Sequence, residues 1–93
     1  MDPMTFVCPV CGYDGLIEPA WDGKNASDEI CPSCGTQFGY HDASGGSAAG
    51  REAIYSRRRN QWIEQGMPWH SLAAEPPPNN WDPGSQLQRV VGP

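Results

Sequence analysis

Residues 5–42 alternate short apolar runs with turn-forming residues. The pattern predicts three short strands, over residues 5–7, 13–18 and 36–42. An exposed turn is expected over residues 19–24, where Asp22-Gly23 is the strongest local turn signal. Hairpins this short enclose little apolar surface, so this part of the chain needs another source of stability.

The second half of the chain follows a different pattern. Glycine, serine and alanine over residues 43–50 predict a flexible linker. Residues 51–66 carry apolar side chains at helical spacing, and Gly66 suits the position just after the end of a helix. Residues 67–93 include three consecutive prolines, which favour polyproline II, so we expect an extended arm. The arm should pack on the same domain, because its tryptophans are costly to leave in water.

Four cysteines stand in two pairs, Cys8 with Cys11 and Cys31 with Cys34, and 19 residues separate the pairs. Each pair has proline after its first cysteine and glycine after its second, a turn that can direct backbone N–H groups toward sulfur. Two such loops, called knuckles, can present four thiolates at the corners of a tetrahedron. The spacing predicts a small metal-stabilised α+β protein in which residues 1–42 form a zinc ribbon.

The chemistry of four thiolates selects the ion. Sulfur ligands in a tetrahedron suit zinc or a single iron, whereas magnesium and calcium prefer oxygen. We expect one zinc ion per chain, in a structural role because a closed four-sulfur shell has no position for water. Iron is the alternative ion, and structural disulfides or a redox-active thiol pair are the alternatives to a metal site.

The composition indicates why an ion would matter. Of the 93 residues, 38% are apolar, and 11 glycines and 10 prolines dilute the core further. A domain of this size buries too little surface to be stable without a staple. Structural zinc binds small peptides with about 10–16 kcal/mol. We therefore expect the metal-free protein to be unfolded through at least residues 5–42.

The charge of the chain excludes some partners. The formal net charge is −5, and four thiolates with one divalent ion would change it to −7, since −5 − 4 + 2 is −7. Such an excess of negative charge argues against nucleic acid as the main partner. The sequence shows neither a membrane-spanning apolar run nor a secretory signal, so we expect a cytoplasmic protein that does not bind membranes.

Few residues are available for catalysis. With all four cysteines occupied, a nucleophile and base would have to involve His41 or His70, and no catalytic motif accompanies them. We expect neither an enzyme nor a small-molecule substrate. His41, Gly12 and Gly35 are instead expected near the metal ligands without binding the ion, and His70 is expected to be a surface or packing residue.

A run of arginines within residues 51–66 is the main basic feature. Successive helical residues point around the helix, so the run cannot form a flat phosphate-binding face. It can be a solvated surface paired with the acidic front half, a surface for an acidic protein partner, or a nucleic-acid contact. The tryptophans can fill the core or form an aromatic docking patch. The candidate partner-binding residues are Arg57, Arg58, Arg59, Trp62, Trp69 and Trp81.

These motifs resemble those of known families. CPVCGY at residues 8–13 and ICPSCG at residues 30–35 resemble the paired knuckles of zinc ribbons and rubredoxins. With FGYHD at residues 38–42 and RRNQWIEQGMPW at residues 58–69, the series is similar to small bacterial cysteine-rich proteins of the CPCC type. That resemblance implies metal-binding knuckles and almost nothing about activity, although some such proteins accompany toxin or secretion systems.

Elimination and resemblance together favour a non-catalytic zinc protein that binds another protein as a small adaptor, with an immunity or regulatory partner as one expectation. The rubredoxin resemblance implies an iron electron carrier, which is the main alternative. A zinc ribbon that binds nucleic acid is the third.

Overall fold

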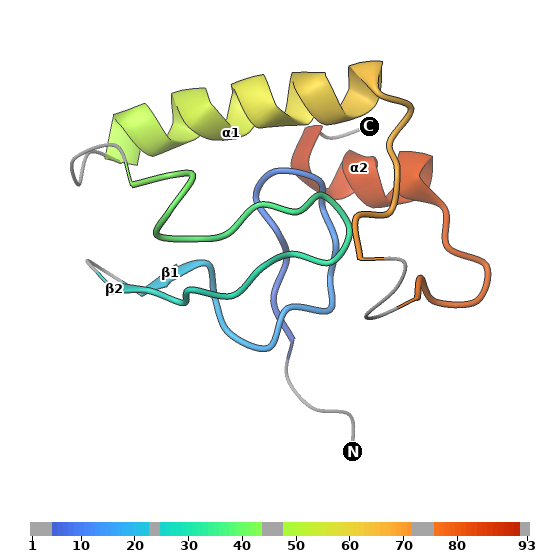
Figure 1. Cartoon of the computed structure of the whole chain (residues 1–93), viewed down its shortest axis with the longest axis horizontal. Helices are drawn as coiled ribbons and strands as arrows, with labels where there is room; N and C mark the ends of the chain where they lie inside the picture. The colour runs from blue at the N-terminus through green and yellow to red at the C-terminus, as the bar shows by residue number, and fades with distance from the viewer. Residues whose placement is uncertain (1–4, 23–24, 44–47, 72–75, 92–93) are drawn as a thin grey trace.

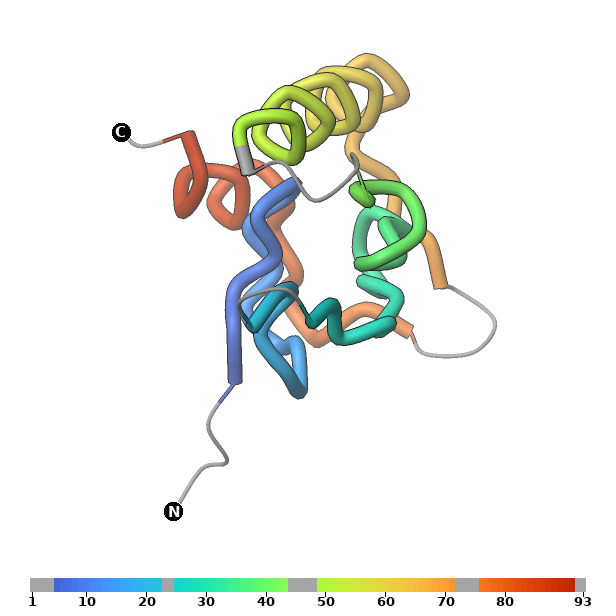
Figure 2. Tube along the Cα trace, turned by 90° about the vertical axis from the view of Figure 1, so that its left-hand side faces the viewer, coloured from blue at the N-terminus to red at the C-terminus, as the bar shows by residue number. Residues whose placement is uncertain are grey.

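The computed structural model describes residues 5–22, 25–43, 48–71 and 76–91. Its elements are β1 (Trp21–Asp22), β2 (Asn25–Ala26), α1 (Ala48–Glu64) and α2 (Pro83–Val91). α1 runs across the top of the two cysteine-bearing loops, and α2 lies beneath one end of α1 (Figure 1). The view along α1 shows the first cysteine loop, in blue, between α2 and the green second loop (Figure 2).

The strands of the front half are shorter than the sequence predicts. Phe6 and Leu16 exchange both backbone hydrogen bonds, at 2.9 and 3.1 Å, so the first two predicted strands meet in a single bridge. β1 and β2 form an antiparallel hairpin that pairs Trp21 with Ala26. β1 lies inside residues 19–24, where a turn was predicted, so the turn is shorter than expected; Gly23 and Lys24 lie outside the described residues.

The predicted strand over residues 36–42 is wrong beyond its start. Gln37 forms a bridge with Ile30, but its carbonyl then accepts the N–H groups of Tyr40, at 3.2 Å, and His41, at 3.1 Å. Gly39, with φ of 97°, allows this tight turn. The pairing ends at Phe38, whose N–H still donates to Glu29 O at 3.1 Å, and the turn directs Asp42 inward.

Asp42 joins the front half to α1 through a fully buried carboxylate. Its Oδ2 accepts hydrogen bonds from Trp21 Nε1 at 2.8 Å and from the Tyr55 hydroxyl at 2.6 Å, and its Oδ1 accepts one from Gly39 N–H at 2.6 Å. A buried carboxylate with three donors is stabilised in place, so it fixes β1 against α1. Arg51 lies over the Trp21 ring, with its guanidinium carbon 4.2 Å from the ring centre.

α1 (Ala48–Glu64) begins three residues before the predicted 51–66 helix and ends two residues before its predicted end. It starts at Ala48, so the last three residues of the predicted 43–50 linker are helical, and residues 44–47 lie outside the described residues. At the other end, Gly66 has φ of 93°, and Met67 N–H donates to Trp62 O at 2.8 Å. Glycine in this conformation closes a helix, so the assignment of Gly66 is confirmed.

The extended arm predicted over residues 67–93 is wrong for its last part, which forms α2. Asp82 stands just before this helix, and its Oδ1 accepts the N–H groups of Gly84 at 3.1 Å and Ser85 at 3.3 Å. Pro83 occupies the first helical position, where a missing N–H costs nothing. Asp followed by proline is a signal for the start of a helix, but the three prolines upstream led to the prediction of an extended arm instead.

The core is small and aromatic. Leu16, Val10 and Phe38 are fully buried, and Trp62 and Trp69 are 4% and 5% exposed. Trp69 makes edge-on contacts with Tyr13 and with Trp81, with ring centres 5.5 and 5.1 Å apart. The arm also packs on the second cysteine loop, since His70 N–H and Ser71 N–H donate to Ser33 O and Pro32 O. Within the described residues, Trp62 and Trp69 thus fill the core, and the start of the arm packs on the second cysteine loop.

Neither α1 nor α2, nor any other helix in the described part of the chain, has the length and apolar character needed to cross a membrane.

Candidate metal centre

Two similar loops place the four cysteines. In the first cysteine loop (residues 8–12), Gly12 N–H donates to Cys8 O at 3.0 Å, and in the second (residues 31–35), Gly35 N–H donates to Cys31 O at 2.8 Å. Both glycines have positive φ, 86° and 81°, a conformation that other residues rarely adopt. A Cβ at Gly12 would also collide with the backbone of α2, and one at Gly35 would lie 2.6 Å from the His70 ring. Both positions therefore require glycine for conformation and for space.

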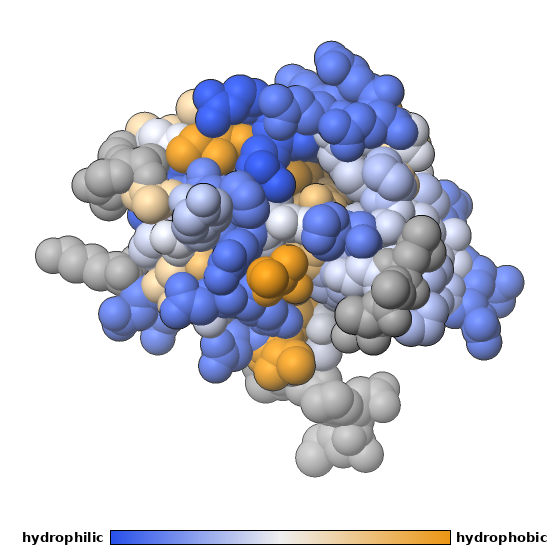
Figure 3. Space-filling model, viewed as in Figure 1, coloured by the Kyte–Doolittle hydropathy of each residue, from blue (hydrophilic) through white to orange (hydrophobic). Residues whose placement is uncertain are grey.

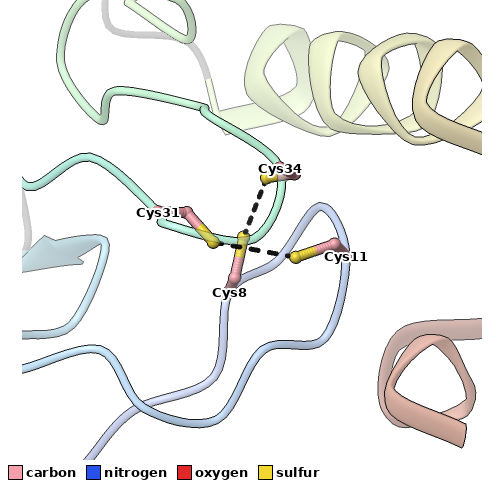
Figure 4. A group of neighbouring side chains, drawn as sticks. All are labelled: Cys8, Cys11, Cys31 and Cys34. Carbon is pink, nitrogen blue, oxygen red and sulfur yellow. Dashed lines mark hydrogen bonds between the residues drawn. The ribbon is translucent and has the colours of Figure 1, made fainter. Parts of the chain in front are cut away.

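The sulfur atoms converge from the two loops (Figure 4). All four Sγ atoms lie within 4.8 Å of one another, and the nearest pairs, Cys8 with Cys34 and Cys11 with Cys31, are 3.8 and 3.7 Å apart. A disulfide would bring two sulfurs to about 2.05 Å. A tetrahedral ion with metal–sulfur bonds of about 2.3 Å separates its sulfurs by about 3.8 Å. The cluster has the dimensions of a four-sulfur metal site and not of two disulfides.

Burial and crowding make four thiolates unfavourable without a cation. Cys8, Cys11 and Cys31 are fully buried, and Cys34 is partly exposed. Burial is the main cause that raises the pKa of the Cys8 thiol. Hydrogen bonds from the other three cysteines, Cys11 first, lower the pKa of Cys34. Burial thus disfavours a thiolate at Cys8, and a divalent cation would supply the charge that stabilises four thiolates at this site.

Polar groups of the loops approach two of the sulfurs. Val10 N–H donates to Cys8 Sγ at 3.4 Å, as expected for a knuckle. Thr36 Oγ1 lies 3.3 Å from Cys34 Sγ and is fully buried. His41 does not join the sulfur cluster; its Nδ1 accepts the N–H of Gln37 at 2.9 Å, and its burial lowers its pKa.

Two residues of the arginine run turn toward the loops. Arg59 donates from Nε to Val10 O and from a terminal nitrogen to Pro9 O, both at 2.7 Å. Arg58 donates from Nε to Thr36 Oγ1 at 2.8 Å. Of the run, Arg57 is exposed, whereas Arg58 and Arg59 are partly buried and bonded to the loops, so these two candidates do not form an open partner surface. The carbonyls of a tight loop need donors, and the helix lies close enough to supply them.

α2 supplies further donors to the cysteine loops. Gln86 is 4% exposed, and its Nε2 donates to Cys11 O at 3.2 Å and to Ser33 Oγ at 2.9 Å. Its Oε1 accepts the indole N–H of Trp81 at 2.8 Å. Arg89 donates to Gly12 O at 2.8 Å. The Gln86 side chain therefore links both cysteine loops, a role that the sequence analysis did not predict.

The remaining partner-binding candidates also lie inward. Trp62 and Trp69 belong to the buried residues, and Trp62 Nε1 donates to Pro68 O at 2.8 Å. Trp81 is partly buried against the core. Within the described residues, the four cysteines are the one group of three or more side chains that could hold a metal ion. The structure thus brings together the predicted ligands and removes most of the predicted partner surface.

Comparisons with known proteins give relatives without an assigned role. Over 71 residues, the chain is 39% identical to the uncharacterized protein YoaQ of Bacillus subtilis, a match that covers 67% of this chain and 60% of YoaQ. Over 75 residues, it is 37% identical to the uncharacterized protein YozI of the same organism, covering 70% of this chain and 62% of YozI. The chain thus spans about three fifths of the length of these relatives.

No protein-family model matches the chain, so membership in the CPCC type stays a prediction. No solved structure matches it either. The comparisons therefore place the chain beside small Bacillus proteins, and the chemistry of the centre has to be argued from its own geometry.

Proposed function

We propose that this protein binds one zinc ion through Cys8, Cys11, Cys31 and Cys34, and that the ion holds the two cysteine loops together. The observation that carries this proposal is the convergence of four Sγ atoms within 4.8 Å, at separations that fit a tetrahedral ion. Four thiolates give soft ligands in a closed shell, which suits zinc in a structural role. The ion replaces apolar core that a chain of this composition lacks.

The proposed role of the ion is non-catalytic. Three of the four sulfur ligands are fully buried, and four protein ligands complete a tetrahedron, so no position remains where water or substrate would meet the ion. The separated thiols also fit a reducing compartment, which supports a cytoplasmic location as part of the proposal.

Metal analysis with a chelator tests this proposal. The purified protein should contain one zinc per chain, and removal of the ion with a strong chelator should collapse the amide NMR dispersion of residues 5–42. Cys31→Ser should lose metal and cooperative unfolding together. Retention of native dispersion after the ion has been removed would refute a structural metal. One iron per chain, with a red oxidised form and reversible reduction, would establish the electron carrier instead of zinc.

Beyond the ion, we propose that the protein acts by binding another protein. Support comes from apolar side chains that the fold leaves in solvent, among them Ile17, 77% exposed, and Ile30, 51% exposed. Orange patches interrupt an otherwise mostly hydrophilic face (Figure 3). Ile17 and Ile30 line one open groove of about 480 Å³ with Tyr13, Pro32 and Pro78. Apolar side chains gathered at a groove are typical of interaction surfaces.

A comparison of capture experiments tests the interaction. The metal-loaded protein and its Ile17→Asp variant are used as baits in extracts of the native host. A specific partner should be captured by the unmodified bait and lost with the variant, while both baits keep their metal. Capture of the same proteins by both would exclude this groove as the binding surface.

A further inference from the structure

Neighbouring arginines on α1 have opposite surroundings. Arg58 and Arg59 reach the cysteine loops through the hydrogen bonds described above. Arg57, one position earlier, is exposed, and the described part of the chain offers its side chain no hydrogen bond or ion pair. The helix thus presents two inward arginines and one outward arginine of the same charge.

The inward arginines act on both loops. The guanidinium of Arg59 spans two consecutive carbonyls, Pro9 O and Val10 O, between the two cysteines of the first loop. Arg58 reaches the second loop through Thr36, whose Oγ1 contacts both Arg58 Nε at 2.8 Å and Cys34 Sγ at 3.3 Å. The distance from Arg58 Nε to Cys34 Sγ is therefore at most the sum of these two distances.

Charge gives these contacts a second role. Four thiolates with one divalent ion carry a net charge of −2, since −4 and +2 give −2. Arg89 also reaches a loop, but its charge is balanced by Asp14, 3.3 Å away. Among the described residues, neither Arg58 nor Arg59 has a carboxylate within ion-pair distance. Two arginine charges thus face the two excess negative charges of the loaded centre.

We propose that Arg58 and Arg59 are positioning residues of the metal centre, which hold the two cysteine loops from α1 and balance the charge of the ion–thiolate complex. This inference rests on the proposed metal binding. It accounts for two arginines that the sequence offered as candidates for a partner surface, and it makes α1 part of the centre.

The test compares Arg58→Gln and Arg59→Gln with the matched control Arg57→Gln, which removes the same charge from the exposed position. Affinity is measured by titration with Co²⁺, whose thiolate absorption reports four-sulfur binding, in competition with a chelator. Loss of a group that supports metal ligands typically weakens binding by about 10- to 100-fold. The two inward variants should lose affinity by this factor, and R57Q should bind Co²⁺ as the unmodified protein does.

The reduction potential of the iron-loaded protein tests whether the charges of Arg58 and Arg59 act on the centre, in addition to their hydrogen bonds to the loops. The reduced Fe²⁺ form carries one more negative charge than the Fe³⁺ form, so removal of a nearby positive charge should lower the potential. R58Q and R59Q should lower it more than R57Q does. Arg58→Lys and Arg59→Lys keep the charge and should keep the potential of the unmodified protein.

Each result decides the proposal. Equal affinity and potential in the inward variants and R57Q would overturn it, and lysine variants with potentials as low as the glutamine variants would overturn the charge role. If the glutamine variants do not fold with metal, the lysine variants decide it by keeping or losing the potential. If the unmodified protein binds neither Co²⁺ nor iron, the proposed function fails and this inference fails with it. If the unmodified protein binds metal normally and the arginine variants keep its affinity and potential, the inference alone is refuted.

Discussion

Gln86→Ala is expected to destabilise the metal-loaded protein strongly, although it touches no metal ligand side chain. The side chain makes three hydrogen bonds, to Cys11 O, to Ser33 Oγ and from Trp81 Nε1, in a nearly solvent-free position. A hydrogen bond contributes about 0.5–1.5 kcal/mol net, so the loss of all three costs about 3 kcal/mol. For a domain of this size, a loss of 1 kcal/mol in unfolding free energy lowers the thermal unfolding midpoint by about 4–8 °C, so Gln86→Ala should lower that midpoint by about 12–24 °C.

Gln88→Ala is the matched control. Gln88 lies on α2, two positions away, and is exposed. Both variants change helix propensity equally because both replace glutamine with alanine. The free energy of unfolding is measured by urea titration of the metal-saturated proteins, with tryptophan fluorescence as the signal. A Q86A value within about 0.5 kcal/mol of the Q88A value would refute the conclusion that Gln86 holds the two loops together, because exposed substitutions cost no more than that.

Three further outcomes follow from the structure. Tyr55→Phe removes the hydroxyl that donates to the buried Asp42 and should cost about 1.5–3 kcal/mol in urea unfolding, whereas Tyr40→Phe, at an exposed ring, should cost much less. Hydrogen bonds from Ser85 lower the pKa of Asp82. The carboxylate therefore stabilises the fold fully above its unfolded pKa of about 4, and this stabilisation is lost as the pH falls through the lower folded pKa. An Asp82→Ala variant should be less stable than the unmodified protein at neutral pH and approach its stability in acid, as measured by thermal unfolding between pH 2 and 7. Chelation of the metal should raise amide hydrogen exchange in α1 and α2 as well as in the loops; unchanged protection of both helices would show that they fold independently of the centre.

The sequence predicts the local features of the centre well because they depend on neighbouring residues. The two Cys-Pro-x-Cys-Gly turns require glycine with positive φ after the second cysteine, and both Gly12 and Gly35 have it. Gly66 ends α1 for the same reason. Each of these predictions concerns a backbone conformation set within about five residues, which a single sequence reports directly.

Long-range contacts were outside the reach of the sequence pattern. Arg59 meets Pro9 and Val10 across 50 and 49 positions, and Gln86 meets Cys11 across 75. An arginine run on a helix reads equally well as a solvated face, a partner surface or a set of inward donors, because the destination depends on how the helix docks. α2 itself was predictable from its Asp82-Pro83 start, and it was missed because its nine residues follow a proline-rich segment.

These long-range contacts change how the chain divides into parts. A ribbon, a helix and an arm were expected as successive segments, yet the carbonyls of the first cysteine loop are shared between Arg59 of α1 and Gln86 and Arg89 of α2. A tight loop that folds its N–H groups toward sulfur turns its carbonyls outward, and buried carbonyls without donors are costly. The two helices together satisfy those carbonyls. Because each helix contacts the loops and the proposed ion would hold the loops together, metal binding and helix docking should occur as one cooperative event rather than as the folding of a ribbon with appended segments.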